Sequence, residues 1–315
     1  LANTHQILSY LNLGKTDSVL SVLPFHYSFG LSLLLTHISC GGRVVIDNRF
    51  AFPAKVLETM QQEKVTGFSG VPSHYSILAN RTEFLQQEWP HLRYLTQAGG
   101  AMAPALTQQI RETISSEIDL FVMYGETEAS ARLSYLPPEK LTQKYGSIGI
   151  PIPGVELVAR RSDGTICDTG ESGEITASGD NIMQGYWNDP EETAKVLRDG
   201  ILYTGDIGFQ DEDGYFFVVD RVKNFIKAGA NRVSAKEIEE CIMEIDGVSE
   251  CCVIGVADEM LGEAIAAHIV SDGLEKNDIL RHCKTRLAMF KIPQAVHFHS
   301  ELPKHESGKI DKSQL

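Results

Sequence analysis

Apolar and polar positions alternate in two distinct ways over the stretch from Ser18 to Tyr124. Short apolar runs indicate buried strands, whereas Phe52–Lys64 repeats its apolar residues at helical spacing. A further helix is expected to open at Pro104, where the missing backbone N–H costs nothing. The expected strands are Ser21–Pro24, Arg43–Asp47, Arg93–Thr96 and Ile118–Met123. This alternation indicates a mainly parallel sheet, whose ligands bind beyond the carboxyl ends of its strands.

The pattern changes between Gly149 and Val219, where turn signals separate short apolar runs, as is typical of antiparallel hairpins. It changes again after Arg221. Ser234 and Glu237 have the spacing of a capping box, and apolar residues then recur on one helical face. The last expected elements are a strand, Cys251–Val256, and a helix, Ile279–Leu287.

The sequence therefore predicts an α/β fold in two domains. Residues 1–220 would combine a mainly parallel sheet and its helices with an antiparallel β-rich segment. Residues 221–315 would form a small α+β C-terminal domain. A length of 315 residues suits about two domains.

Composition excludes several classes of protein. The formal net charge of -14 argues against a duplex nucleic-acid binder, which needs basic surface to displace counterions. No apolar run is long enough for a membrane-spanning helix. None of the six cysteines is spaced as CxxC, which argues against zinc and indicates free thiols in a reducing, cytoplasmic compartment.

Four short motifs occur in order along the chain. They are Tyr124-Gly-Glu-Thr-Glu128, Tyr203-Thr-Gly-Asp206, Asp220-Arg-Val-Lys223 and Pro303-Lys-His-Glu-Ser-Gly-Lys309. Their order and spacing resemble the adenylate-forming superfamily, which includes acyl- and aryl-CoA synthetases, firefly luciferase and carrier-protein-loading adenylation domains. Enzymes of this kind join a carboxylic acid to AMP and then hand the acyl group to a thiol.

The first half of such a reaction joins two anions, so a metal ion and a mobile cation are the groups to look for. The resemblance implies that Tyr124 packs on adenine, that Thr127 bonds the α-phosphate, and that Glu128 ligates Mg²⁺, which prefers hard oxygen donors. Gly125 would let the backbone approach the nucleotide. It also implies that Asp206 and Arg221 bind the ribose.

The resemblance extends to the adenine-side loop, although a Gly-Gly turn alone is usually only a turn. The full set of implied ATP or AMP ligands is Gly99, Gly100, Ala101, Met123, Tyr124, Gly125, Glu126, Thr127, Asp206, Arg221 and Lys309.

Three lysines have separate implied roles. Lys309, with Thr127, would act in the first half-reaction, because a cation beside the carboxylate and the α-phosphate stabilises the transition state. Lys227 is a candidate for the second half-reaction. Lys223 stands at the hinge, about which the small mobile domain would rotate against the remainder of the large adenylation domain.

The aromatic segment that contains His26 and Tyr27 resembles the wall of the acid pocket, together with Gly100. Relatives that activate amino acids have Asp at the position of His26. A histidine there argues for an aliphatic, hydroxy or aromatic acid, although a histidine beside aromatics is often structural. Ala228-Gly229-Ala230 lies where relatives admit pantetheine, and a tight turn is the alternative.

The resemblance thus implies an ATP-dependent acid–thiol ligase that uses CoA or a carrier-protein phosphopantetheine. One alternative is an acyl-AMP ligase dedicated to a carrier protein, which Lys227, Arg232 and Lys236 would favour as a basic docking patch. The other is a non-catalytic AMP- or ATP-binding module. Leu1 does not resemble a native start, and the phosphate-gripping loop of the family is not in this sequence, so we expect a fragment of a longer enzyme.

Overall fold

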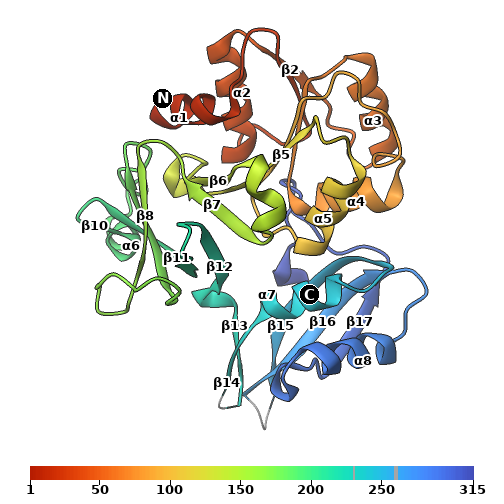
Figure 1. Cartoon of the computed structure of the whole chain (residues 1–315). Coiled ribbons are helices and arrows are strands. Elements are labelled where there is room, and N and C mark those ends of the chain that lie inside the picture. Colours follow the sequence, from red (N-terminus) through yellow and green to blue (C-terminus); the bar gives the residue numbers. More distant parts are fainter. Residues whose placement is uncertain (230, 259–261) are drawn as a thin grey trace.

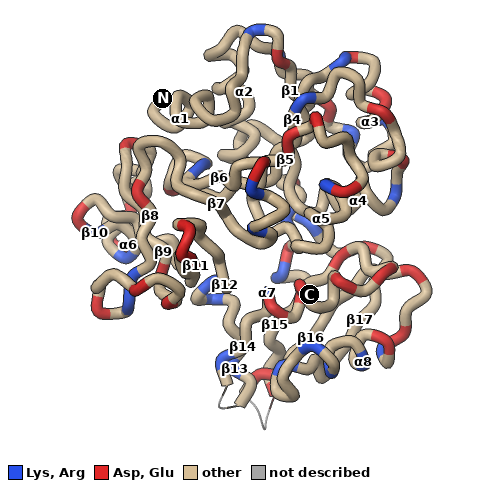
Figure 2. Tube along the Cα trace, in the orientation of Figure 1, with Lys and Arg blue, Asp and Glu red and all other residues tan. Residues whose placement is uncertain are grey.

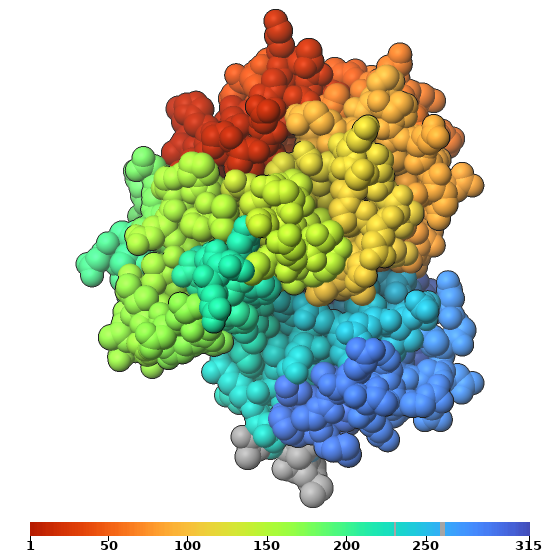
Figure 3. Space-filling model, viewed as in Figure 1, coloured from red at the N-terminus to blue at the C-terminus, as the bar shows by residue number. Residues whose placement is uncertain are grey.

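The chain forms two modules that lie against each other (Figures 1 and 3). The computed structural model describes residues 1–229, 231–258 and 262–315. The first module carries the strands up to Arg221, and the second module carries the strands from Phe225 onward. The predicted α/β architecture with a small additional sheet is confirmed.

The parallel part of the first module contains five strands in the order β2-β1-β3-β4-β5. Three of its helices begin with a proline, which ends the preceding loop and has no N–H to leave unpaired. The strands are β1 (Ser18–Ser21), β2 (Arg43–Ile46), β3 (Gly67–Gly70), β4 (Tyr94–Gln97) and β5 (Asp119–Tyr124). The helices are α1 (Ala2–Leu11), α2 (Ser28–Cys40), α3 (Pro53–Gln62), α4 (Pro72–Arg81) and α5 (Pro104–Thr113).

The antiparallel segment continues the parallel sheet. β5 pairs with β6, and the order then runs β6-β7-β12-β11-β9-β8 within one 12-stranded sheet of the described residues. The sequence pattern did not predict that the parallel and antiparallel strands form one sheet. The pairing of β7 with β12 joins segments distant in the chain and leaves no signal in the local sequence. The elements are β6 (Ser134–Leu136), β7 (Ser147–Pro151), β8 (Val155–Arg160), β9 (Gly173–Gly179), α6 (Pro190–Val196), β10 (Leu197–Arg198), β11 (Ile201–Gln210) and β12 (Phe216–Arg221).

The second module is a separate sheet covered by two helices. Its described strands have the order β14-β13-β16-β15, with β17 parallel to β16. Ser234 accepts a hydrogen bond from the Glu237 N–H, as the expected cap requires. The elements are β13 (Phe225–Ala228), β14 (Asn231–Ser234), α7 (Ala235–Met243), β15 (Val248–Asp258), β16 (Gly262–Ser271), α8 (Lys276–Arg286) and β17 (Ala295–His299).

One expected strand lies elsewhere. The prediction of Ser21–Pro24 is wrong by three residues, since β1 spans Ser18–Ser21. Pro24 cannot donate to a ladder, and the apolar residues before it belong to the loop that leads into α2.

Helix α4 connects the two modules. The Ser73 hydroxyl donates to the Gly308 carbonyl over 2.6 Å, and Arg81 donates to the Ser300 carbonyl over 3.1 Å. The Ser76 hydroxyl also donates to the Ser249 carbonyl. Between these contacts, His74 is buried against Phe50. The residue before Lys309 is therefore bonded directly to α4 through Ser73.

The expectations about cysteines, membrane-spanning helices and charge can also be compared with the described residues. All six cysteines are free thiols. Among the described helices, none has the length and apolar character needed to cross a membrane. Acidic and basic residues are interspersed over both modules (Figure 2).

Burial lowers the pKa of His74 to about 3, with a further contribution from Lys304. Because this pKa is depressed in the folded state, the stability it contributes is present above about pH 6.5 and is lost as pH falls toward 3. We expect His74→Gln to reduce the acid dependence of the unfolding free energy by up to about 1.4 kcal/mol per pH unit. Urea unfolding at pH 7, 6, 5 and 4 measures this slope.

His91→Gln is the matched control, because His91 is exposed. A slope in His74→Gln that equals the wild-type slope would contradict the assignment.

Candidate active site

The site begins where β5 ends. After Tyr124 the chain turns through Gly125 and Glu126 into a short 3-10 turn, Thr127–Ala129, and then returns alongside itself. A Cβ on Gly125 would stand 2.2 Å from the Ala131 carbonyl oxygen. Position 125 must therefore be glycine because the chain returns alongside itself there. This contact constrains the residue more closely than the expected approach of a nucleotide does.

Tyr124, Asp206 and Arg221 form one hydrogen-bonded group. The Tyr124 hydroxyl donates to Asp206 Oδ2 over 2.7 Å, and Arg221 Nε donates to Asp206 Oδ1 over 2.7 Å. Asp206 on β11 and Arg221 on β12 are register partners in adjacent strands, which explains their contact. The Asp206 residue is only 3% exposed. Three residues from separate motifs thus meet at the carboxyl end of β5.

Glu126 adds a second buried carboxyl to this group. Burial, together with the nearby charges of Glu128 and Asp206, raises the pKa of Glu126 to about 8. Arg221 acts in the opposite direction, with Nη2 at 3.9 Å from Glu126 Oε2. Arg221 therefore compensates the charge of both Asp206 and Glu126.

The Glu128 side chain is held by a residue that the motifs did not identify. The Tyr186 hydroxyl donates to Glu128 Oε1 over 2.6 Å, and the Met183 N–H donates to the Glu128 carbonyl over 2.7 Å. Tyr186 lies in the loop between β9 and α6. A lone tyrosine between glycine and tryptophan carries no recognisable signal in a single sequence.

Thr127 connects the turn to α2. Its hydroxyl lies 3.3 Å from the Ser28 hydroxyl, at the first residue of that helix. The turn and the aromatic segment before α2 therefore share one surface.

Lys309 comes from the second module and enters this surface. Its Nζ stands 5.2 Å from the centre of the Tyr27 ring. A Cβ on Gly99 would lie 2.3 Å from the Tyr27 hydroxyl and 3.5 Å from Lys309 Cε, so the three residues converge. Burial and the charge of Arg221 lower the pKa of Lys309, while Glu128 and Asp206 oppose this. The lysine is thus within electrostatic range of the carboxylates.

The remaining predicted ligands of the first module differ in exposure. His26 is exposed and faces Glu306 of the Lys309 loop, with 3.7 Å between Nε2 and Oε2. The Gly100 carbonyl accepts from Gln97 Nε2 over 2.8 Å, and Ala101 is exposed. Met123 is buried, and its sulfur accepts from the Tyr10 hydroxyl.

The other two lysines are not in this group. Lys227 is exposed on β13, and its backbone N–H donates to Glu263 Oε2 over 2.6 Å. Lys223 is exposed in the 3-10 turn Val222–Asn224 that follows β12. Figure 1 shows β13 extending away from the end of β12. In the expected pantetheine passage, Ala228 is the last residue of β13 and Gly229 follows it, whereas Ala230 lies outside the described residues.

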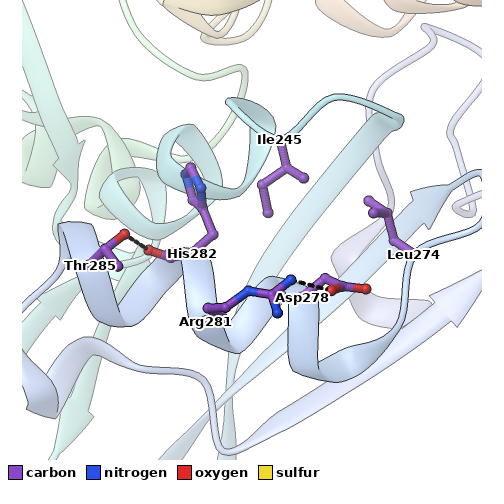
Figure 4. Close-up of a pocket in the computed structure, with 6 residues that line it drawn as sticks. All are labelled: Ile245, Leu274, Asp278, Arg281, His282 and Thr285. Atoms are coloured by element: carbon purple, nitrogen blue, oxygen red, sulfur yellow. Dashed lines mark hydrogen bonds and ion pairs between the residues drawn. The ribbon is translucent and has the colours of Figure 1, made fainter.

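A pocket of about 360 Å³ lies in the second module, and none of the residues above line it (Figure 4). It is bordered by Ile245, Leu274, Asp278, Arg281, His282 and Thr285. Arg281 is paired there with Asp278 over 2.6 Å, so the pocket offers no free cation to an anionic ligand from that residue.

Comparison with known proteins identifies relatives for nearly the whole chain. The model of the AMP-binding enzyme family matches residues 1–187, and that of the AMP-binding enzyme C-terminal domain matches residues 237–309. Feruloyl-CoA synthase of Amycolatopsis sp. is 36% identical over 99% of this chain and 64% of its own length. A long-chain-fatty-acid–CoA ligase of Bacillus subtilis is 32% identical over 100% of this chain and 57% of its own length.

A solved structure is similar throughout. The o-succinylbenzoate coenzyme A synthetase of Bacillus subtilis, in complex with ATP and magnesium ion, superimposes with a TM-score of 0.85 at 29% identity. The match covers 100% of this chain and 64% of that one. The chain therefore spans less than two thirds of the length of these relatives.

Removal of the shared cation tests the electrostatics of the site. We expect Arg221→Gln to destabilise the fold by about 1 kcal/mol at pH 8, a modest loss because the guanidinium is half exposed and screened. At pH 5 the loss should shrink, since Glu126, with a pKa of about 8, is then protonated. Denaturant unfolding at both pH values measures the difference.

Arg281→Gln removes an exposed arginine that pairs with Asp278 on α8 and serves as the control. An equal loss at pH 5 and pH 8 in Arg221→Gln would show that Glu126 does not depend on this cation.

Proposed function

The chain belongs to the AMP-binding enzyme family, and from that premise we propose that its protein is an ATP-dependent acid–thiol ligase. The observation that carries the proposal is the position of Lys309, which reaches from the second module to Tyr27, within range of Glu128 and Asp206. The joining of a substrate carboxylate to a triphosphate brings two anions together. Such a reaction requires a cation at the site.

The nucleotide would bind at the end of β5. Both oxygens of Asp206 already accept hydrogen bonds, and each keeps a lone pair for a ribose hydroxyl. Arg221 can donate to the same sugar. The Tyr124 ring would lie against the base, with the Gly99-Gly100 loop on its other side.

A magnesium ion fits the donor set at Glu128. In the described part of the chain, no three His, Cys, Asp or Glu side chains gather to hold a metal. One carboxylate with the phosphates of the substrate is the usual arrangement for Mg²⁺. When bound there, the ion would neutralise phosphate charge, while the Tyr186 hydroxyl keeps the Glu128 carboxylate in place.

Two steps follow from this arrangement. A carboxylate oxygen of the acid attacks the α-phosphorus of ATP, pyrophosphate leaves, and acyl-AMP forms. The sulfur of a thiol then attacks the acyl carbon, AMP leaves, and the thiol proton passes to solvent. Lys309 and Thr127 would stabilise the first step. Rotation of residues 221–315 about Lys223 would then withdraw Lys309 and bring Lys227 to the site.

We propose a carboxylic acid without an α-amino group as the substrate. His26 offers no carboxylate to pair with an ammonium, and its neighbour Glu306 belongs to the loop at the entrance. Tyr27 and Gly100 would form the wall nearer the reacting carboxylate. The free cysteines fit a reducing, cytoplasmic compartment.

CoA is favoured as the acceptor over a carrier-protein phosphopantetheine. The relatives named above are CoA ligases. Of the basic patch expected for a carrier protein, Lys236 is engaged with the Val218 carbonyl and with Glu240 at 3.5 Å. Lys227 and Arg232 remain exposed, which is a small patch for an acidic partner.

Substitution of the lysines separates the two steps. We expect Lys309→Ala to reduce ATP–pyrophosphate exchange roughly 100- to 1000-fold, the size of the effect when one transition-state donor is removed. Lys227→Ala should keep the exchange and lose thioester formation from added acyl-AMP. Both are measured on the intact protein with a panel of carboxylic acids.

Lys284→Ala, an exposed position on α8, is the control for loss of a lysine. Full exchange in Lys309→Ala would contradict the proposed role of Lys309. No exchange in the wild type with any acid, while AMP still binds, would contradict a ligase and favour a nucleotide-binding module.

The metal site has its own test. We expect Tyr186→Phe to raise the Mg²⁺ concentration for half-maximal exchange about tenfold, because partners of a metal ligand typically have effects of this size. The KM for the acid should not change. Tyr145→Phe, which packs against the core of the first module, is the control. An unchanged Mg²⁺ requirement in Tyr186→Phe would exclude this role.

A further inference from the structure

Arg132 is a buried arginine immediately beyond the turn that carries Thr127 and Glu128. The residue is only 2% exposed. Its guanidinium carbon lies 4.2 Å from the centre of the Phe29 ring, and its Nη2 donates to the Ser32 hydroxyl over 3.3 Å. Its Nε donates to the sulfur of Met123 over 3.3 Å.

All of these partners are neutral. No ion pair joins Arg132 to a carboxylate anywhere in residues 1–229, 231–258 and 262–315. Burial lowers the pKa of Arg132, and the groups that oppose this are the hydroxyls of Tyr10 and Tyr27. A buried guanidinium normally has an anionic partner, because its desolvation is otherwise uncompensated. The fold thus contains a cation that lacks a counter-charge of its own.

The backbone around Arg132 is strained and firmly held. Ser130 has φ 55° and Ala131 has φ 99°, a region that residues with a side chain rarely adopt. The Asn3 side chain bonds both the N–H and the carbonyl of Arg132, over 3.2 and 2.9 Å. Asn181 donates to the same carbonyl over 3.0 Å. The strain turns the chain inward and directs the arginine toward α2.

Arg132 and Lys309 contact neighbouring residues of the same aromatic segment. Lys309 stands over Tyr27, while Arg132 contacts Phe29 and Ser32, two and five residues further along. The charge of Arg132 also acts on the Tyr27 hydroxyl. The Tyr27 and Phe29 ring centres are 6.3 Å apart. An acid whose carboxylate lies beside Lys309 and whose chain passes both rings would therefore direct its far end toward Arg132.

We propose that Arg132 determines specificity by binding an oxygen acceptor, a second carboxylate or a hydroxyl or keto oxygen, at the far end of the acid. This inference rests on the proposed ligase function and names its substrate class. Bidentate binding of a carboxylate suits the planar fork of a guanidinium. A plain alkyl chain of equal length would leave the buried charge without a partner.

The test compares acids of matched length in ATP–pyrophosphate exchange by the intact protein. Dicarboxylic acids and ω-hydroxy acids of four to eight carbons are set against the monocarboxylic acids of the same length. At the best length we expect kcat/KM to favour the acid with a far oxygen at least tenfold, since a site built to bind a polar group rejects the analogue without it. The two series distinguish a carboxylate from a hydroxyl.

In Arg132→Met we expect this preference to fall to about one, with exchange of the monocarboxylic acids retained. Arg132→Lys should keep part of the preference. Arg93→Met, which removes an arginine paired with Asp17 elsewhere in the first module, should leave the ratio unchanged although stability falls. Because the effect is a ratio between two substrates, a general loss of stability does not produce it.

The wild-type protein alone can overturn the inference. Equal or better use of the monocarboxylic acid at every length contradicts it, even if Arg132→Met fails to fold, and leaves the ligase function intact. An unchanged ratio in a folded Arg132→Met also contradicts it. If no acid supports exchange, the ligase function fails and this inference fails with it.

Discussion

The structure depends on the interaction between carboxylates at one end of the large sheet and two cations, Arg221 and Lys309, that reach them from other parts of the chain. Asp206, Glu126 and Glu128 belong to the first module, and burial, together with the charges of the other two carboxylates, raises the pKa of Glu126 to about 8. Arg221 lies at the last position of β12, next to the junction, and Lys309 comes from the far end of the second module. The arrangement is complete only when the two modules are in contact.

The fold provides that contact in a specific way. The antiparallel strands continue the parallel sheet, so β11 brings Asp206 to the end of β5. Helix α4 then holds the Gly308 carbonyl through Ser73. Gly99, with positive φ, leaves room for the Tyr27 and Lys309 side chains, and Gly308, also with positive φ, leaves room for His74 of α4. A site assembled from two modules can be dismantled by moving one of them, which would suit the two-step reaction proposed above.

Much of the fold and of the candidate site could be predicted from the sequence, and most of what could not depends on contacts between segments distant in the chain. Motif spacing identified Tyr124, Asp206, Arg221 and Lys309, and the structure brings them together. Spacing could not reveal Tyr186 or Arg132, because each acts through contacts with elements that are distant in the chain. The strand at Ser18–Ser21 was misplaced because an apolar run before a proline resembles a strand. The join between the parallel and antiparallel parts depends on pairing across β7 and β12, which local pattern does not encode.

The central claim is that a nucleotide binds where Asp206 meets Tyr124 and that Lys309 is part of the same site. Calorimetric titration of AMP into the intact protein, into Asp206→Ala and into Lys309→Ala tests this most directly. The account predicts one AMP per chain, binding weakened at least about tenfold in Asp206→Ala by the loss of a charge-assisted contact, and a measurable loss in Lys309→Ala. Equal affinity in all three proteins would place the nucleotide elsewhere and contradict the account.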